Sequence, residues 1–392
     1  MDFADSAEEA SFRLRLRQWL DEQRPFPATP LSDDDRVEYL SGWQRRLYDA
    51  GWMALSFPPE VGGQGLGPIY EAILLDELGS AGAPTVWHYG YVARVIHLYG
   101  SADQQNRFLQ PAFRGEERWC QGFSEPNAGS DLSAIATRAI RHGDTYVITG
   151  QKVWTSEAHW ADWCLLLARS EPNCPRHQSL SCFILPMDAP GVTVRPFRQI
   201  TGDVEFAEVF LDGVVLPESM RVGEPGKGWQ IAMSTVEFER GPADVGFISD
   251  LRRILDELED GLAAGNVRGE HGLRARLSWA RISVEVLRLR VLTSLSRRAT
   301  GQTRIGESSV DKLLMTSAEQ ELAHVAADLH GAATMLGQRP EILHQYLWSR
   351  AASVYGGTSQ IQRDIIATRL LGLSRSDTRP HARSQASAII GK

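Results

Sequence analysis

The segment Ser124-Glu125-Pro126-Asn127-Ala128-Gly129-Ser130-Asp131 has the composition of a loop that contacts a ligand. Its small residues, proline, glycine and hydroxyl groups let backbone N–H groups and side-chain hydroxyls come close to a polar molecule. Taken alone, the same composition also fits an ordinary capped turn. The loop is therefore a candidate binding element that needs support from other parts of the chain.

Residues 228–246, GWQIAMSTVEFERGPADVG, contain a candidate acid–base residue. Apolar side chains recur there at the spacing of one helical face, namely Trp229, Ala232, Met233 and Val236. Continuing this stripe gives Glu239 and Arg240 on the inward face, whereas Glu237 falls on the more polar side. A carboxylate on a buried face is costly unless it is paired or used in chemistry. Glu239 is thus either a general base or one half of a structural ion pair.

Three blocks of different character position these residues. Residues 1 to about 118 have helical patterns, residues 119–222 alternate short apolar runs with turn residues, and residues 223–375 return to long helical patterns. The expected strands are Thr145–Thr149, Trp163–Ala168, Ser181–Pro186, Val192–Val194 and Val209–Leu211. The expected later helices are Ala243–Leu262, Leu273–Arg298, Ser308–Leu336 and Ile342–Val354, with Gly301 and Gly337 as stop signals. We predict a mostly α protein with a helical domain, a middle β-barrel and a four-helix bundle, followed by a loose tail at 376–392.

Composition limits the function classes. The chain has 392 residues, of which 43% are hydrophobic and 23% charged, as expected of a globular protein. A net charge of −8 argues against nucleic-acid binding. The four cysteines lack metal-ligand spacing and are expected to be reduced, so we predict no metal site. No apolar run is long enough to span a membrane, and the acidic start does not resemble a signal or transit peptide, so we expect a cytoplasmic protein.

Three stretches in this order resemble the acyl-CoA dehydrogenase family. They are residues 119–139 (WCQGFSEPNAGSDLSAIATRA), 143–163 (GDTYVITGQKVWTSEAHWADW) and 354–373 (VYGGTSQIQRDIIATRLLGL). Each stretch alone is a weak signal, but the combination is specific, and the similarity runs from about residue 5 to 375. In the family, the β domain covers one side of an FAD ring that the helices hold from the other.

The resemblance implies a set of cofactor contacts. Ser124 matches a hydroxyl at the pyrimidine edge of the flavin, and Ser130 matches a serine near the cofactor phosphates and the pantetheine arm of the substrate. Trp154 and Ser156 match residues that lie against the ring. The remaining implied contacts are Gln121, Thr358 and Gln360. Core packing is the alternative for Trp154, and a cap or turn role is the alternative for Ser156 and Thr358.

The position of the base departs from many family members. They carry a carboxylate two residues before the threonine of the GTSQ motif, where this chain has Gly356. Glu239 matches the alternative catalytic position of the long-chain and isovaleryl-type enzymes. The resemblance implies that the Gly356 N–H contributes to the oxyanion hole and that Arg240 lies near the substrate. A glycine at this position also leaves room for a bulky or branched acyl group.

One cofactor contact is altered. Family members often carry an Arg-x-x-Phe pattern that reaches the FAD diphosphate of a neighbouring subunit, and residues 265–280 lack the phenylalanine. Arg276, with Arg274, is the candidate replacement, because arginine suits phosphate geometry. A solvated helix face is the alternative for both residues.

The resemblance implies an FAD-dependent dehydrogenation of an acyl-CoA to the trans-2-enoyl-CoA, with electrons passed to an electron-transfer flavoprotein. It also implies a homo- or hetero-oligomer, a dimer or tetramer, and a role in fatty acid or lipid metabolism. The alternatives are a non-catalytic or cofactor-sharing subunit of a heteromeric dehydrogenase, or a flavin monooxygenase or oxidase of the same fold. The acyl group stays open between fatty, branched and polycyclic, and the thioester between CoA and a carrier protein.

Overall fold

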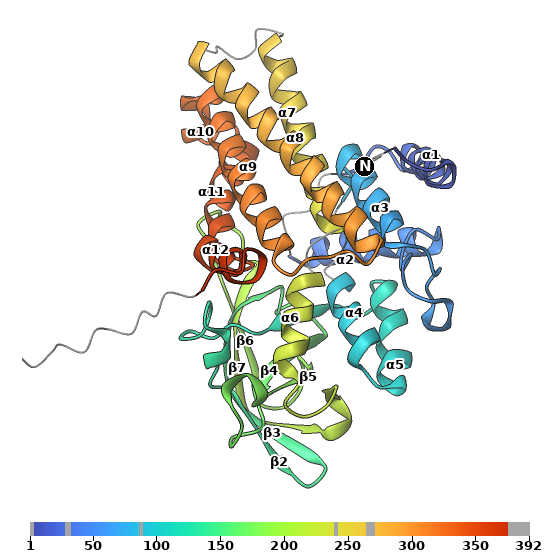
Figure 1. The fold of residues 1–392 in the computed structure, drawn as a ribbon, viewed down its shortest axis with the longest axis vertical. Coiled ribbons are helices and arrows are strands. Elements are labelled where there is room, and N and C mark those ends of the chain that lie inside the picture. Colours follow the sequence, from blue (N-terminus) through green and yellow to red (C-terminus); the bar gives the residue numbers. More distant parts are fainter. Residues whose placement is uncertain are drawn as a thin grey trace, which may run out of the picture.

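The computed structural model describes residues 4–27, 33–84, 86, 89–238, 242–263 and 271–374. Within these ranges the chain runs from a group of helices through a β-sheet into a second group of longer helices (Figure 1). This is the predicted helical, β, helical order, and the fold class is confirmed. No helix in these ranges has both the length and the apolar character needed to cross a membrane. The predicted tail, 376–392, lies outside the described residues.

The first group of helices packs around an aromatic core. Its members are α1 (Ala7–Glu22), α2 (Asp33–Asp49), α3 (Pro68–Ala81), α4 (Tyr89–Tyr99) and α5 (Ala102–Phe113). Phe12, Leu16 and Leu20 recur every fourth residue, so they share one face of α1 and are buried there in the same cluster as Trp43 of α2. Burial of this apolar face holds α1 on the rest of the domain.

The central sheet has the strand order β6–β7–β3–β2–β4–β5–β8, with β1 beside β4. Its strands are β1 (Trp119–Gly122), β2 (Arg138–His142), β3 (Thr145–Ser156), β4 (Trp163–Arg169), β5 (Leu180–Pro186), β6 (Val192–Phe197), β7 (Phe206–Pro217) and β8 (Arg221–Val222). β1 and β4 are parallel, whereas β3 with β7 and β4 with β5 are antiparallel. Every strand predicted from the sequence is present, and β3 and β7 are much longer than their predicted runs.

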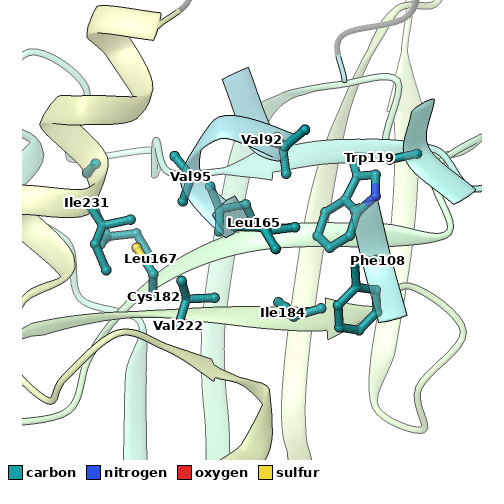
Figure 2. Close-up of a cluster of buried hydrophobic side chains, with 14 of the residues drawn as sticks. Val92, Val95, Phe108, Trp119, Leu165, Leu167, Cys182, Ile184, Val222 and Ile231 are labelled. Carbon is teal, nitrogen blue, oxygen red and sulfur yellow. The ribbon is translucent and has the colours of Figure 1, made fainter. Parts of the chain in front are cut away.

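Helices that precede the sheet in the sequence and a helix that follows it cover one face of the sheet. Figure 2 shows buried side chains from this layer, including Val95 of α4, Phe108 of α5 and Ile231 of α6 against Leu165 of β4 and Ile184 of β5. Removing such apolar surface from water stabilises the fold by roughly 25 cal/mol per Å². The packing fixes the first helix of the later group, α6, directly on the sheet.

The later helices form a bundle beside the sheet (Figure 1). They are α6 (Gly228–Phe238), α7 (Pro242–Ala263), α8 (His271–Ala299), α9 (Glu307–His330), α10 (Ala332–Met335), α11 (Pro340–Trp348) and α12 (Ser359–Ile365). Leu255, Leu287 and Leu322 are fully buried where α7, α8 and α9 meet. Gly301 has a positive φ just after the end of α8, which confirms it as a stop signal, whereas Gly337, also with a positive φ, follows the short α10 and not the end of α9.

Two predicted helices end earlier than expected. The predicted helix 308–336 breaks at Gly331, whose φ of +52° and ψ of −125° leave the helical region. The predicted helix 342–354 stops at Trp348 and continues as a short 3₁₀ turn, Ser349–Ser353. There the carbonyl of Ala352 accepts hydrogen bonds from the side chains of Lys312 and Thr316. A glycine without helical dihedrals and a carbonyl taken by side chains explain the two early ends.

Close helix contacts join the first group of helices to the bundle. A Cβ placed on Gly79 of α3 would lie only 2.5 Å from the carbonyl oxygen of Gly246 on α7. Next to this contact, the Ser249 hydroxyl donates to Asp76, which also accepts a bond from Arg13 of α1. The two glycines let the backbones approach, and the polar bridge fixes the crossing.

Candidate functional site

A fully buried ion pair anchors the loop that follows β1. Lys152 of β3 is 0% exposed, and its Nζ donates to Glu125 Oε1 at 2.7 Å and to the carbonyl of Phe123 at 3.1 Å. The Glu125 carboxylate also accepts bonds from the N–H groups of Ala136 at 2.6 Å and Thr137 at 2.9 Å. Burial alone would raise the pKa of Glu125, but Lys152 and these N–H groups hold that pKa below its ordinary value. Both charges therefore have satisfied partners.

Ser124 lies between the two residues that Lys152 contacts. Its carbonyl accepts a hydrogen bond from the N–H of Val153 at 3.0 Å, which ties the loop to β3 a second time. The Ser124 side chain is half-buried at the end of β1. Gln121 is half-buried within β1, in register with Leu165. The hydroxyl of Ser124 is thus presented at a well-supported position.

Trp154 projects outward because β3 is irregular there. Tyr146, Ile148 and Lys152 share the buried face of β3, so simple alternation would also turn residue 154 inward. A β-bulge between Lys152 and Thr155 reverses the alternation, and Trp154 adopts a φ of +58°, in the left-handed region. A bulky residue in this region is an outlier, and such strain concentrates at functional sites.

The Trp154 indole is supported as a flat aromatic surface. It is 59% exposed, and its ring packs edge-on against Phe197 of β6 at 5.1 Å and Phe206 of β7 at 5.7 Å between centroids. Ser156 is half-buried two residues further along β3, paired in register with Phe206. An exposed, braced indole beside two hydroxyl residues is the arrangement that a planar ring system would contact.

The same end of the sheet is fixed to the bundle. Phe197 and Phe206 flank the connection 198–205, and Asp203 in that connection bonds Nε2 of His344 on α11 at 2.5 Å. Burial raises the pKa of Asp203, but the hydrogen bond and charge of His344, together with Thr201 and Arg36, lower that pKa overall. The connection between the two strands that support Trp154 is therefore bonded to α11.

The glycine pair after α11 has an unusual backbone. Gly356 and Gly357 have φ values of +60° and +89°. The buried Gln362 of α12 donates from Nε2 to the carbonyl of Gly356 at 2.9 Å and of Gly357 at 3.2 Å. A Cβ on Gly356 would meet nothing closer than Lys312 Cε at 3.6 Å, whereas a Cβ on Gly357 would lie 2.5 Å from Gln362 Nε2. A Cβ on the first glycine would make only an ordinary van der Waals contact, whereas the second glycine is tightly enclosed.

Thr358 caps α12. Its Oγ1 accepts a hydrogen bond from the N–H of Ile361 at 3.2 Å, and a hydroxyl that accepts one bond still has a proton to donate. Gln360, in the first turn, is exposed. Both residues are therefore in positions from which a bound molecule can be contacted.

Polar side chains of α9 contact the residues that come just before the glycine pair. Lys312 Nζ donates to the Ala352 carbonyl at 2.7 Å and lies 4.1 Å from the centre of the Tyr355 ring. The Tyr355 hydroxyl donates to Glu319 at 3.4 Å. Burial raises the pKa of Glu319, against the lowering effect of Lys312 and Tyr355. Burial also raises the pKa of Tyr355.

The buried face of α6 differs from the predicted one. The predicted stripe contained Met233, which is 37% exposed, and Trp229, which is only half-buried. The observed buried residues are Gly228, Ile231, Ala232 and Thr235. The predicted inward face was therefore wrong by about one residue, because Gly228 packs directly on the backbone of β5. Glu239 and Arg240 lie outside the described residues, while Glu237 is exposed.

The residues predicted near the diphosphate lie apart from this group. Ser130 is exposed. Arg276 of α8 is paired within the chain, with Asp328 at 2.6 Å and Glu321 at 3.1 Å on α9. Its contact with a neighbouring diphosphate stays a prediction.

The residue types at these positions suit a flavin. Such a ring needs a flat wall and hydrogen-bond partners along its edge. Trp154 would supply the wall, and the hydroxyls of Ser124 and Ser156 and that of Thr358 on α12 would supply edge partners, an assignment that stays a prediction. Across the described ranges, no group of three or more His, Cys, Asp or Glu side chains could hold a metal ion. Three of the four cysteines are buried thiols and Cys174 is exposed.

Sequence reasoning missed the ion pair of Lys152 and Glu125, the bond from Asp203 to His344, and Gln362. The signal for Lys152 was present, because a lysine occupied the buried phase of a strand. The other two contacts join segments that are distant in the sequence or depend on glycine geometry, and the sequence carries no local sign of either.

Family models cover almost all of the chain. The N-terminal, middle and C-terminal domains of acyl-CoA dehydrogenase match residues 6–116, 120–214 and 226–371. Together they span the first helices, the sheet and the bundle.

Individual relatives agree. The acyl-CoA dehydrogenase IpdE1 of Mycolicibacterium smegmatis is 38% identical over 94% of this chain and 98% of its own length. The human mitochondrial short-chain specific acyl-CoA dehydrogenase is 26% identical over 91% of this chain and 88% of its own.

Solved structures share the whole architecture. The Tcur3481-Tcur3483 steroid ACAD has a TM-score of 0.82 at 27% identity and covers 96% of this chain and 100% of its own. The ChsE4-ChsE5 complex from Mycobacterium tuberculosis has a TM-score of 0.81 at 28% identity, with the same coverage. The chain therefore belongs to the acyl-CoA dehydrogenase family, whose members are FAD-containing oxidoreductases that act on acyl-CoA thioesters.

Proposed function

We propose that this chain catalyses the α,β-dehydrogenation of an acyl-CoA thioester to the trans-2-enoyl-CoA. The observation that carries the proposal is Trp154, a large aromatic residue that a bulge turns outward in a strained backbone conformation next to Ser124. When bound, FAD accepts the hydride that leaves the β carbon. The protein must remove the α proton and stabilise the charge that develops on the thioester oxygen.

Glu239 is the proposed base. On the observed buried face of α6, which contains Ile231, Ala232 and Thr235, helical spacing leads next to Phe238, the last residue of the helix. Glu239 follows it in the sequence, and the proposal rests on the match to the alternative catalytic position of the family. Arg240 is proposed to lie near the substrate.

Gly356 is proposed to support the thioester oxygen. Its side chain cannot act as a base, but its N–H is a hydrogen-bond donor in a loop held by Gln362 and Lys312. A Cβ at this position would make only an ordinary contact with Lys312, so the position tolerates a small group. The lack of a side chain there, where many family members carry a carboxylate, is the feature that favours a bulky acyl group over a short linear one.

We propose a polycyclic acyl-CoA as the substrate class. The support is the lack of a side chain at Gly356 together with the steroid ACAD among the similar structures. An electron-transfer flavoprotein is the proposed electron acceptor, as implied by the family resemblance.

We propose that the chain works in an oligomer with a second acyl-CoA dehydrogenase chain, either a copy or a homologue. One face of α8 exposes a row of apolar side chains at helical spacing, namely Trp279, Ile282, Val286 and Leu289. Exposed apolar rows of this kind mark association surfaces. The ChsE4-ChsE5 complex supports a homologous partner.

The test compares Glu239→Gln with Glu237→Gln, which changes an exposed carboxylate of α6 two residues earlier in the sequence. Both variants and the wild type are purified, with a coexpressed homologous chain where one is required, and assayed with linear, branched and steroid-side-chain acyl-CoAs and an artificial electron acceptor. Loss of a general base lowers turnover by about a hundredfold to ten-thousandfold. We expect this loss in Glu239→Gln with the flavin retained, and near wild-type turnover in Glu237→Gln.

Undiminished turnover by Glu239→Gln would refute the assignment of the base. A colourless wild-type protein that oxidises no thioester, alone or with its partner, would favour the non-catalytic subunit. Oxidation of a substrate other than a thioester would favour the monooxygenase or oxidase alternative.

A further inference from the structure

Lys152 is connected to both of the residues that are proposed to contact the flavin, Ser124 and Trp154. Its ammonium bonds Phe123 and Glu125, the residues on either side of Ser124. Along the chain it precedes Trp154 by two residues. One buried side chain is therefore linked to both Ser124 and Trp154.

The contacts around Lys152 leave Ser124 little freedom. Lys152 holds the carbonyl before Ser124 and the side chain after it, and the N–H of Val153 holds the carbonyl of Ser124 itself. The loop also closes on itself through paired backbone bonds between Glu125 and Ala128, both at 3.0 Å. A shift of β3 at residues 152 and 153 would therefore move Ser124 with it.

Net stability does not explain why this ion pair is kept. A buried pair loses the hydration of both charges, and its replacement by neutral groups of similar size is often neutral or even stabilising. Removal of one partner is costly because it leaves the other charge unpaired. A neutral double replacement is therefore expected to fold and to isolate the positional role of the pair.

We propose that Lys152, paired with Glu125, is a positioning residue that sets Ser124 and Trp154 in register with each other for flavin binding. The inference rests on the proposed function, since it takes Ser124 and Trp154 as flavin contacts. It adds a pair of residues that touch neither cofactor nor substrate but determine how both contacts are presented.

The experiment compares the wild type, Lys152→Met with Glu125→Gln, and a control that removes a partly exposed ion pair from the same domain, Arg118→Gln with Asp162→Asn. Each protein is stripped of flavin and titrated with FAD, and visible circular dichroism of the bound flavin is recorded. Hydrogen exchange is followed at the peptide that contains the Val153 N–H. Thermal unfolding checks that each protein is folded.

We expect the Lys152 and Glu125 double variant to bind FAD about tenfold or more weakly, with an altered circular dichroism spectrum and faster exchange at Val153. The control variant should match the wild type in all three measurements. Should the double variant not fold, Glu125→Asp replaces it, because it keeps both charges paired while shortening the side chain that holds the loop, and the same three changes are expected in smaller degree.

Wild-type affinity, spectrum and exchange in a folded variant would overturn the inference and leave the proposed function intact. A wild type that binds no FAD, alone or with its partner chain, would overturn both. Faster exchange at Val153 with unchanged FAD affinity would also overturn the inference, because the pair would then serve the loop alone.

Discussion

Replacing Gly357 by alanine tests the backbone geometry of the loop that contains the proposed oxyanion N–H. Gly356 and Gly357 are neighbours with positive φ, but their surroundings differ. A Cβ on Gly356 meets Lys312 Cε at an ordinary 3.6 Å, whereas a Cβ on Gly357 would lie 2.5 Å from Nε2 of the buried Gln362. Alanine at 356 is thus a matched control for alanine at 357.

The expected cost follows from these contacts. An L-residue in the left-handed region costs roughly 1–2 kcal/mol, and both variants carry this cost. At 357 the Gln362 amide must also move, which weakens its two bonds to the glycine carbonyls at about 1 kcal/mol each. The new methyl group adds overpacking of about 1 kcal/mol or more. Gly357→Ala should therefore be less stable than Gly356→Ala by about 2–3 kcal/mol.

The free energy of unfolding in urea measures this difference. Gln362→Ala provides the second arm of a double-mutant cycle, because it removes the side chain that the methyl group meets. In the Gln362→Ala background, Gly357→Ala should cost only the free energy of placing an alanine in the left-handed region. The coupling energy between the two positions is then about 2 kcal/mol. Equal stability of the two alanine variants, or no coupling with Gln362, would show that this side chain does not enclose Gly357.

The remaining predictions concern a buried carboxyl and a helix crossing. Burial raises the pKa of Glu319 above its ordinary value of 4.5, so the folded state holds a proton more tightly than the unfolded state, and the free energy of unfolding should fall as pH rises from about 4.5 through the folded pKa. Glu319→Gln has no such group, and urea unfolding from pH 4 to 8 should show a smaller decline in this variant; an identical pH dependence would contradict the assignment. Gly79→Ala should destabilise by about 2–4 kcal/mol, because its methyl group would lie 2.5 Å from the backbone oxygen of Gly246. Gly42→Ala on α2, where a Cβ meets nothing within 4 Å, should instead stabilise by about 0.5–1 kcal/mol in thermal or urea unfolding, and a similar loss in both variants would argue against a tight crossing.

The sequence predicted the order of the three blocks and the existence of every predicted strand, because alternation and helical spacing are local properties. It did not predict the bulge in β3. Uninterrupted alternation from Tyr146 and Ile148 would place Trp154 in the core. The bulge depends on pairing with β7, more than fifty residues away, so no local pattern encodes it.

The ion pair of Lys152 and Glu125 shows a different limit. Its lysine occupies an inward-facing position of β3, and a charged residue at such a position can be noticed in the sequence. Its partner lies in a loop whose course depends on the whole sheet, so the pairing itself cannot be predicted. The contact between Asp203 and His344 likewise joins the β domain to α11 across the fold. Local sequence patterns do not predict such contacts between distant segments, although these contacts hold the site in place.

The inward face of α6 was predicted wrongly because a glycine was not considered as part of a buried face. The predicted stripe took large apolar residues as the inward face, yet the helix turns Gly228 toward β5, where a Cβ would lie 2.6 Å from the backbone of Leu180 and Ser181. The absence of a side chain lets the helix approach the strand, and this approach sets its rotation by about one residue. Spacing from Ile231, Ala232 and Thr235 then leads to Phe238, the last residue of α6. The proposal for Glu239 therefore depends on its match to the alternative catalytic position of the family, and the comparison of Glu239→Gln with Glu237→Gln tests that match.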